Sequence, residues 1–194
     1  MRKILCLVLF AGLTSSASAL ELFGKGSISK NYLAADKNTI SVSLTGGFGF
    51  SLLPFMRVEA RYTNISTLQN KMDIVTTNVV GILSDIKTQT AIYSVGLDFQ
   101  FLNEKSAFQP FIYIGAGYIE TERSYYFTES NSSFSDYYSE PKQLGISANA
   151  GVGFRLRLAK SLAFEVEAFA YAIDIQKPNP IPNLYGTAGL RIFI

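Results

Sequence analysis

The fold is decided by residues 145–171, GISANAGVGFRLRLAKSLAFEVEAFAY. In the first half of this stretch every second residue is apolar, and the residues between are polar, charged or glycine. The apolar set comprises Ile146, Ala148, Ala150, Val152, Phe154, Leu156 and Leu158. Side chains alternate across a β-strand with a period of two, whereas a helix needs apolar residues three and four positions apart. The stretch therefore predicts a long strand with one apolar and one polar face.

The alternation resumes after a short break at residues 159–161. The apolar set of this second strand comprises Phe164, Val166, Ala168 and Ala170. Glu165 and Glu167 lie on the opposite face. Two strands joined by a tight connection form a hairpin. In that hairpin the two carboxylates share a face with Arg155 and Arg157, where opposite charges neutralise one another.

The first 19 residues have the pattern of a secretory signal peptide. A basic start, with Arg2 and Lys3, precedes an apolar run, and residues 17–19, ASA, match a small-residue cleavage site. The apolar run is too short to cross a bilayer core of about 30 Å. We therefore expect residues 1–19 to be removed and residues 20–194 to form the mature domain.

Removing that segment changes the charge balance and the cysteine content. The whole chain has 17 basic and 15 acidic residues, and without Arg2 and Lys3 both counts are 15. The remainder is formally neutral, so we expect no nucleic-acid partner. The single cysteine, Cys6, also lies in the segment, so the remainder has neither a disulfide nor a thiol.

The rest of the chain repeats the alternating pattern. We predict eight strands, over residues 22–30, 40–52, 55–64, 87–101, 108–121, 145–158, 162–171 and 184–194. Long and short connections alternate, which places the long ones at one end of the sheet. Apolar residues make up 48% of the chain, yet no run is long enough for a transmembrane helix. Strands of ten or more residues then favour an all-β transmembrane barrel over a soluble β-domain.

The polar face of these strands carries nine charged residues. They are Arg57, Glu59, Arg61, Asp98, Arg155, Arg157, Glu165, Glu167 and Arg191. In a membrane, an arginine turned to lipid at the midplane costs about 2–4 kcal/mol, and nine charges would exceed the roughly 5–15 kcal/mol that keeps a protein folded. We therefore predict a charge network in the barrel interior. Glycines on the same face leave room for the long side chains.

Two strands carry motifs that point to a known family. Residues 110–118, PFIYIGAGY, and 151–156, GVGFRL, resemble strands of the small eight-stranded outer-membrane barrels of Gram-negative bacteria, which include the OmpA transmembrane domain, OmpX and the opacity-type proteins. The resemblance covers residues 20–194. It implies an eight-stranded antiparallel up-and-down β-barrel surrounded by outer-membrane lipid. Residues 190–194, LRIFI, are similar to the terminal strand that the barrel-assembly machinery reads in that family, although here Phe193 is next to last.

The composition argues against catalysis. The chain contains no histidine, and barrel enzymes resembling lipid A deacylases, omptin proteases or phospholipase A use a histidine base. We expect no cofactor, no metal site and no enzymatic activity. Glu165 and Glu167 form a conceivable acid–base pair, but their position beside Arg155 and Arg157 favours a structural network.

The remaining candidates for function lie in the predicted loops. Residues 122–143 carry six aromatic residues among serines, namely Tyr125, Tyr126, Phe127, Phe134, Tyr137 and Tyr138. Tyrosine mixed with serine is typical of recognition surfaces, which would give an extracellular ligand as partner. Alternatively, these rings extend the strands or form the aromatic girdle of the barrel. Residues 65–86 are unusually apolar for a loop, and they would cover the barrel mouth, extend the strands or contact a partner.

Three functional hypotheses follow. The first is a non-enzymatic outer-membrane barrel with a structural or surface-recognition role through its long loops. The second is a narrow channel, or a conduit for small hydrophobic molecules, although balanced charges inside weigh against it. The third is an exported soluble barrel with a ligand in an apolar interior.

Overall fold

The computed structural model describes residues 20–34, 37–75, 80–102, 106–129, 134–173 and 182–194. The predicted signal peptide, residues 1–19, lies outside these ranges. The strands are β1 (Leu20–Ala34), β2 (Lys37–Leu53), β3 (Met56–Val75), β4 (Val80–Gln100), β5 (Phe108–Glu129), β6 (Ser135–Ser139), β7 (Gln143–Ala159), β8 (Leu162–Ile173) and β9 (Pro182–Phe193). Within the described ranges, no helix has the length and hydropathy of a membrane crossing.

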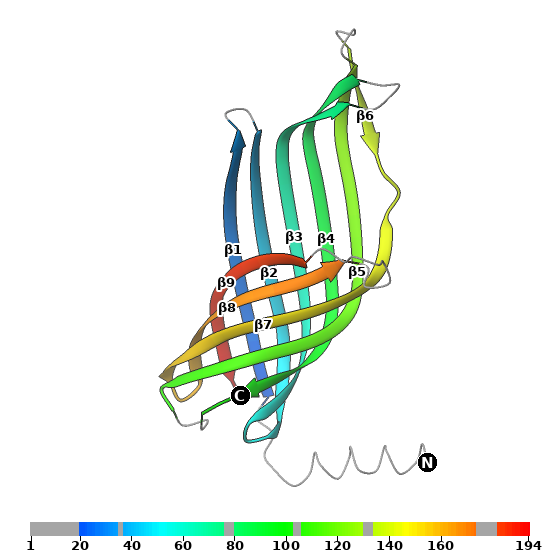
Figure 1. The fold of residues 1–194 in the computed structure, drawn as a ribbon. Coiled ribbons are helices and arrows are strands. Elements are labelled where there is room, and N and C mark those ends of the chain that lie inside the picture. Colours follow the sequence, from blue (N-terminus) through cyan, green and yellow to red (C-terminus); the bar gives the residue numbers. More distant parts are fainter. Residues whose placement is uncertain (1–19, 35–36, 76–79, 103–105, 130–133, 174–181) are drawn as a thin grey trace, which may run out of the picture.

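The strands close into an antiparallel barrel (Figure 1). From β1 to β5 and from β7 to β9, each strand pairs with the next along the chain, and β1 also pairs with β9. β6 and β7 both pair with β5, at successive positions along it, so together they occupy one place in the wall. The wall therefore has eight strand positions, and the predicted eight-stranded all-β barrel is confirmed.

The side chains face the two sides of the wall as their alternation predicts. Arg155 and Glu165 pair across β7 and β8, and both are fully buried inside. Val152 is 58% exposed and Ile192 48% exposed on the outer surface. This apolar outside and charged inside is the reverse of a soluble barrel, so the hypothesis of an exported soluble barrel with an apolar interior is wrong.

The outward apolar surface has the height of a membrane. On β5 it runs from Phe108 to Tyr118, ten residue steps or about 33 Å along the strand. At the usual strand tilt this corresponds to a vertical height close to the roughly 25 Å apolar band of outer-membrane barrels. Tyr62 and Tyr93 lie at its upper margin, with ring centroids 5.1 Å apart. These rings and Tyr118 are placed as an aromatic girdle is.

The long loops predicted at one end are mostly strand. β3 and β4 pair beyond the girdle from Ile65 with Thr90 to Val75 with Val80, so residues 65–86 are not a long loop, and the alternative that they extend the strands is confirmed. A bulge at Asp85, whose φ is 50°, interrupts the alternation there. Leu83 and Ile86 are buried inside this extension, which explains the apolar character of the segment. The side chains of residues 72–80 lie outside the described set.

The wall is shorter on the opposite side (Figure 1). β8 and β9 each have 12 residues, against 22 in β5. β9 begins at Pro182, and the sequence just before it has prolines at positions 178 and 180. Proline cannot donate to a strand ladder, so this spacing opposes a longer β9. β1 and β2 also continue beyond the girdle, where Thr39 pairs with Gln69, and β3–β6 reach highest above the membrane-spanning part.

Candidate functional site

The barrel interior holds a network of five cations and five carboxylates. Among the described residues, the buried charged side chains are Glu21, Lys25, Arg57, Glu59, Arg61, Asp98, Arg155, Glu165, Glu167 and Arg191. They come from β1, β3, β4, β7, β8 and β9, so the barrel closure brings together residues far apart in sequence. The charges balance, which is the condition under which buried ions are tolerated.

Arg191 on β9 contacts three carboxylates at hydrogen-bonding distance. Its guanidinium lies 2.8 Å from the carboxylates of Glu21, Glu59 and Glu165, each contacted through a different nitrogen. Three donors in a planar fork allow one arginine to hold three strands at once. Arg191 therefore ties β1, β3 and β8 together in the centre of the barrel.

Arg155 on β7 makes a second bridge. Its Nε donates to Glu165 at 2.7 Å, and its Nη1 donates to Asp98 on β4 at 3.1 Å. Its remaining nitrogen also contacts Asp98 and lies 3.6 Å from Glu59. Glu165 and Glu59 are thus shared between Arg155 and Arg191, and the two clusters form one network.

The network continues towards the middle of the barrel. Arg61 donates to Glu59 at 2.9 Å and to Glu167 at 2.8 Å. Lys25 lies 2.6 Å from Glu165 and also contacts Glu167. Each of these carboxylates is held by two or more cations, which favours a neutralised network over the acid–base pair considered for Glu165 and Glu167.

Aromatic rings pack against the guanidinium groups. The Arg61 guanidinium lies 3.3 Å from the ring centroid of Tyr113, and that of Arg155 lies 4.0 Å from the centroid of Phe111. Such stacking stabilises arginine where water is excluded. Gly96 makes the arrangement possible, because a Cβ there would lie 2.6 Å from the Tyr113 ring. The predicted use of inward glycines as space for long side chains is seen at this position.

Two members of the network, Glu21 and Lys25, were not among the predicted residues. They alternate with Leu22 and Gly24, so the period-two signal is present. The glycines of β1 weaken that signal, and the predicted strand began only at residue 22. Glu21 reaches Arg191 and also Arg57, whose Nε lies 2.6 Å from its carboxylate.

Arg157 is the predicted network member that lies apart from the rest. Its side chain is only partly buried at the short-turn end of the barrel. Its Nη2 donates to the carbonyl of Lys160 at 2.7 Å, and its guanidinium lies 4.7 Å from the Phe193 ring centroid. The structure therefore places it at the rim, where it closes the β7–β8 turn.

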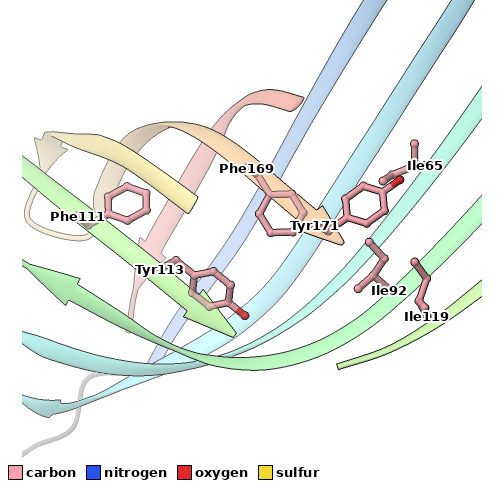
Figure 2. Packing of buried hydrophobic residues seen from close by; sticks show 7 residues of the cluster. All are labelled: Ile65, Ile92, Phe111, Tyr113, Ile119, Phe169 and Tyr171. Carbon is pink, nitrogen blue, oxygen red and sulfur yellow. The ribbon is translucent and has the colours of Figure 1, made fainter. Parts of the chain in front are cut away.

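An apolar layer begins among the charges, where Tyr113 and Phe111 stack on arginines, and continues above them, and nothing in the sequence pattern indicated it. It consists of Ile65, Ile92, Phe111, Tyr113, Ile119, Phe169 and Tyr171, with Tyr185 packed against it. Figure 2 shows Tyr171 of β8 lying across the lumen close to Ile65 of β3. Tyr171 and Tyr185 stack with centroids 5.8 Å apart. An eight-stranded barrel is just wide enough to be filled by its side chains, and these two layers fill it.

The six aromatic residues of the predicted loop lie on and beside a hairpin above the membrane. Tyr125, Tyr126 and Phe127 belong to β5, Tyr137 and Tyr138 belong to β6, and Phe134 precedes β6. Hereafter these six residues are the aromatic hairpin. The pairs Tyr125–Tyr138 and Tyr126–Tyr137 have centroids 5.8 and 5.4 Å apart. The predicted loop at residues 122–143 is therefore largely a hairpin, and its rings extend the strands.

The aromatic hairpin is distinct from the girdle. Tyr125 lies seven residues beyond Tyr118, or about 23 Å along β5. Between them lie polar groups suited to water, including an ion pair of 2.7 Å between Lys142 and Glu120. The hydrogen bond to Glu120 raises the pKa of Lys142 above its ordinary value. The rings therefore stand in the aqueous region and away from lipid.

Within the described residues, no group of histidine, cysteine and acidic side chains is arranged to hold a metal ion. No family model matches the sequence, and no curated protein matches it.

Solved structures do match the fold. Neisserial surface protein A (NspA) superposes with a TM-score of 0.51 at 14% identity, over 91% of this chain and 95% of that one. A major outer membrane protein from Thermus thermophilus gives 0.50 at 10% identity, over 91% and 100%. The N-terminal β-barrel domain of Pseudomonas aeruginosa OprF gives 0.47 at 15% identity, over 91% and 98%. The first two likenesses show that the fold is that of small outer-membrane barrels.

Proposed function

We propose that this outer-membrane β-barrel is a closed, non-enzymatic protein that contacts an extracellular ligand or surface through its aromatic hairpin. The observation that carries the proposal is the exposure of the rings far above the girdle. Phe134 is 83% exposed and Tyr137 61% exposed. A contiguous group of exposed rings is typical of an interaction site. Residues 1–19 would direct export, and the LRIFI segment of β9 would engage the barrel-assembly machinery.

The composition of the hairpin suits recognition. Tyrosine offers a flat ring and a hydroxyl at little cost in conformational entropy, and serines beside it supply adaptable hydrogen bonds. Tyr126 and Tyr137 pair on one face of the hairpin, whereas Tyr125 and Tyr138 pair on the other. The long pairing of β4 with β5 holds both faces on a rigid support. A rigid hairpin covered with aromatic rings favours a recognition role over a purely structural role.

A binding comparison tests this role. Cells displaying the protein are applied to an array of immobilised glycans and matrix proteins, and the double variant Tyr126→Ser/Tyr137→Ser is compared with the wild type. The control is Ser124→Ala/Ser139→Ala, which changes a neighbouring cross-strand pair without removing a ring. We expect the ring variant to lose binding and the serine variant to keep it. Absence of wild-type binding, or equal binding by all three proteins, rejects the recognition role.

The channel hypothesis is the alternative, and the filled lumen argues against it. An ion would have to pass the apolar layer and then displace a balanced charge network. We expect planar-bilayer recordings to show no conductance above background. Steady single-channel steps from the purified barrel would restore this hypothesis. Release of the protein from membranes by carbonate would instead contradict its integral location.

A further inference from the structure

The lipid-facing wall of β1–β5 contains a groove. Two hollows of about 460 and 620 Å³ lie side by side on the outer surface and share Gly46 and Tyr62, and together they are called the groove here. The first is lined by Gly46, Gly47, Phe48, Ala60, Arg61, Tyr62, Tyr93, Ser94, Val95, Ala116 and Gly117. Arg61 and Ser94 point their side chains inward and contribute backbone only. The accessible surface is therefore almost entirely apolar.

The groove arises from small residues between large ones. Gly46, Ala60 and Ala116 form its low points because their side chains point outward and are small or absent, and Val95 stands between Ala60 and Ala116. Phe48 and Tyr62 stand beside them as walls, since Ala60 pairs with Phe48, and Gly46 pairs with Tyr62. Gly46 does not have a positive φ, and a Cβ added there would meet its nearest atom at 3.8 Å. The fold therefore has room for a side chain at this position.

One end of the groove is polar. Asn64 lines the second hollow, and its side-chain amide donates to the Tyr62 hydroxyl at 3.4 Å. This pair lies at the upper margin of the apolar band, where lipid headgroups and esters meet the hydrocarbon. The groove thus runs from hydrocarbon depth to a hydrogen-bonding end, and this arrangement matches the two ends of a lipid.

We propose that this groove is a binding site for one acyl chain of a membrane lipid, whose ester or headgroup end lies at Asn64 and Tyr62. The site rests on the membrane location of the barrel and is independent of the recognition role. The groove is continuous with the lipid-facing surface, so acyl chains are already its neighbours. An open apolar hollow suits a flexible chain, because the chain can adapt to its floor and contact the side chains that border it.

A second copy of the barrel is the competing occupant. The outer wall of a barrel is convex, and its outward side chains would contact the rims, Phe48, Tyr62 and Tyr93, before reaching the floor. A stable protein interface also requires roughly 1,200–2,000 Å² of total buried surface, far more than one groove offers. The shape therefore favours lipid, and the experiment below distinguishes the two.

The chain contains no tryptophan, so a single introduced one reports its own surroundings. Phe48→Trp places the reporter in the groove wall, and Phe164→Trp places a matched reporter on the outward face of β8. Each variant is reconstituted with phospholipid carrying brominated acyl chains, which quench tryptophan on contact, and is then transferred to detergent without bromine. We expect quenching to persist for Phe48→Trp and to disappear for Phe164→Trp.

A second experiment fills the groove with a larger side chain. Gly46→Leu in the Phe48→Trp background occupies the floor, and we expect it to abolish the persistent quenching and the lipid adduct in native mass spectra. Gly186→Leu on β9 is the matched control, because it also points outward and has no atom within 4 Å of an added Cβ. It should leave both signals unchanged.

Three results would overturn the site. The first is equal recovery of fluorescence by both tryptophans in detergent. The others are persistent quenching and a lipid adduct that remain in Gly46→Leu, or that are lost equally in Gly186→Leu. A dimer mass that disappears in Gly46→Leu would identify a second copy as the occupant instead. Unboiled gel migration verifies that every variant is folded. Carbonate extraction separates failure of this site from failure of the membrane location itself.

Discussion

The membrane-spanning and extramembrane parts of β3 differ in pattern although both are strand. Between Arg57 and Thr63 the residues alternate strictly, because one face meets lipid and the other lines a packed interior. Above the girdle, from Ser66 to Lys71, polar residues appear on both faces because the outer face meets water. The backbone continues through both parts. The strict alternation of apolar and polar residues therefore indicates that one face of a strand meets lipid. Its absence does not indicate that the strand has ended.

The largest effect is expected when a cation is removed from the packed interior of the membrane-spanning part. Arg191→Met leaves the carboxylates of Glu21, Glu59 and Glu165 without their shared partner. Loss of one member of a buried ion network costs about 3–5 kcal/mol. We expect a correspondingly lower free energy of unfolding, measured by urea titration of the barrel in lipid vesicles. Arg157→Met is the control, and equal destabilisation of the two variants would contradict the network's central role.

The second prediction places an arginine on the outer surface, once in the membrane-spanning part and once in the extension above the girdle. Leu97→Arg exposes an arginine to lipid near the middle of the apolar band, because Leu97 pairs with Ile114, and the expected cost there is about 2–4 kcal/mol. Ile82→Arg places the same side chain on the outer face of the extension, where Ile82 is 42% exposed. We expect that variant to unfold at nearly the wild-type urea concentration. Similar losses at both positions would mean that the band extends higher than the girdle.

The interior of the barrel was only partly predictable from the sequence. The alternation around Arg155 and Glu165 predicted the barrel, its orientation and the interior charges, because lipid enforces a strict pattern. It also predicted that Arg155 meets Glu165 within the hairpin, but not the contacts between distant strands, since the contact of Arg191 with Glu59 depends on closure of the whole barrel. The apolar layer was also missed. Ile92 and Ile119 sit on the polar face of their strands, and only the rings opposite them explain their burial.

The third prediction concerns the extension, where the sequence predicted a loop. Amide hydrogen exchange should show protection at residues 67–69 and 86–88, which pair across β3 and β4. We expect these amides to exchange faster than those of residues 57–63, because the extension opens locally without unfolding the barrel. Mass spectrometry of the exchanged protein measures both segments together. Complete exchange of the extension at the earliest time would support the loop, and equal protection would remove the difference between the two regions.

The smallest effect is expected at the ion pair between Lys142 and Glu120. Its 2.7 Å distance resembles those around Arg191, but the Lys142 side chain is 53% exposed, and water screens the pair. The folded-state pKa of Lys142 is raised by Glu120, so any stabilisation is present below the ordinary value of 10.5 and is lost as pH rises through the folded value. We expect Lys142→Met to unfold like the wild type at pH 7 in urea titrations. A loss comparable to that of Arg191→Met would mean that distance, and not the solvent around it, sets the strength of these pairs.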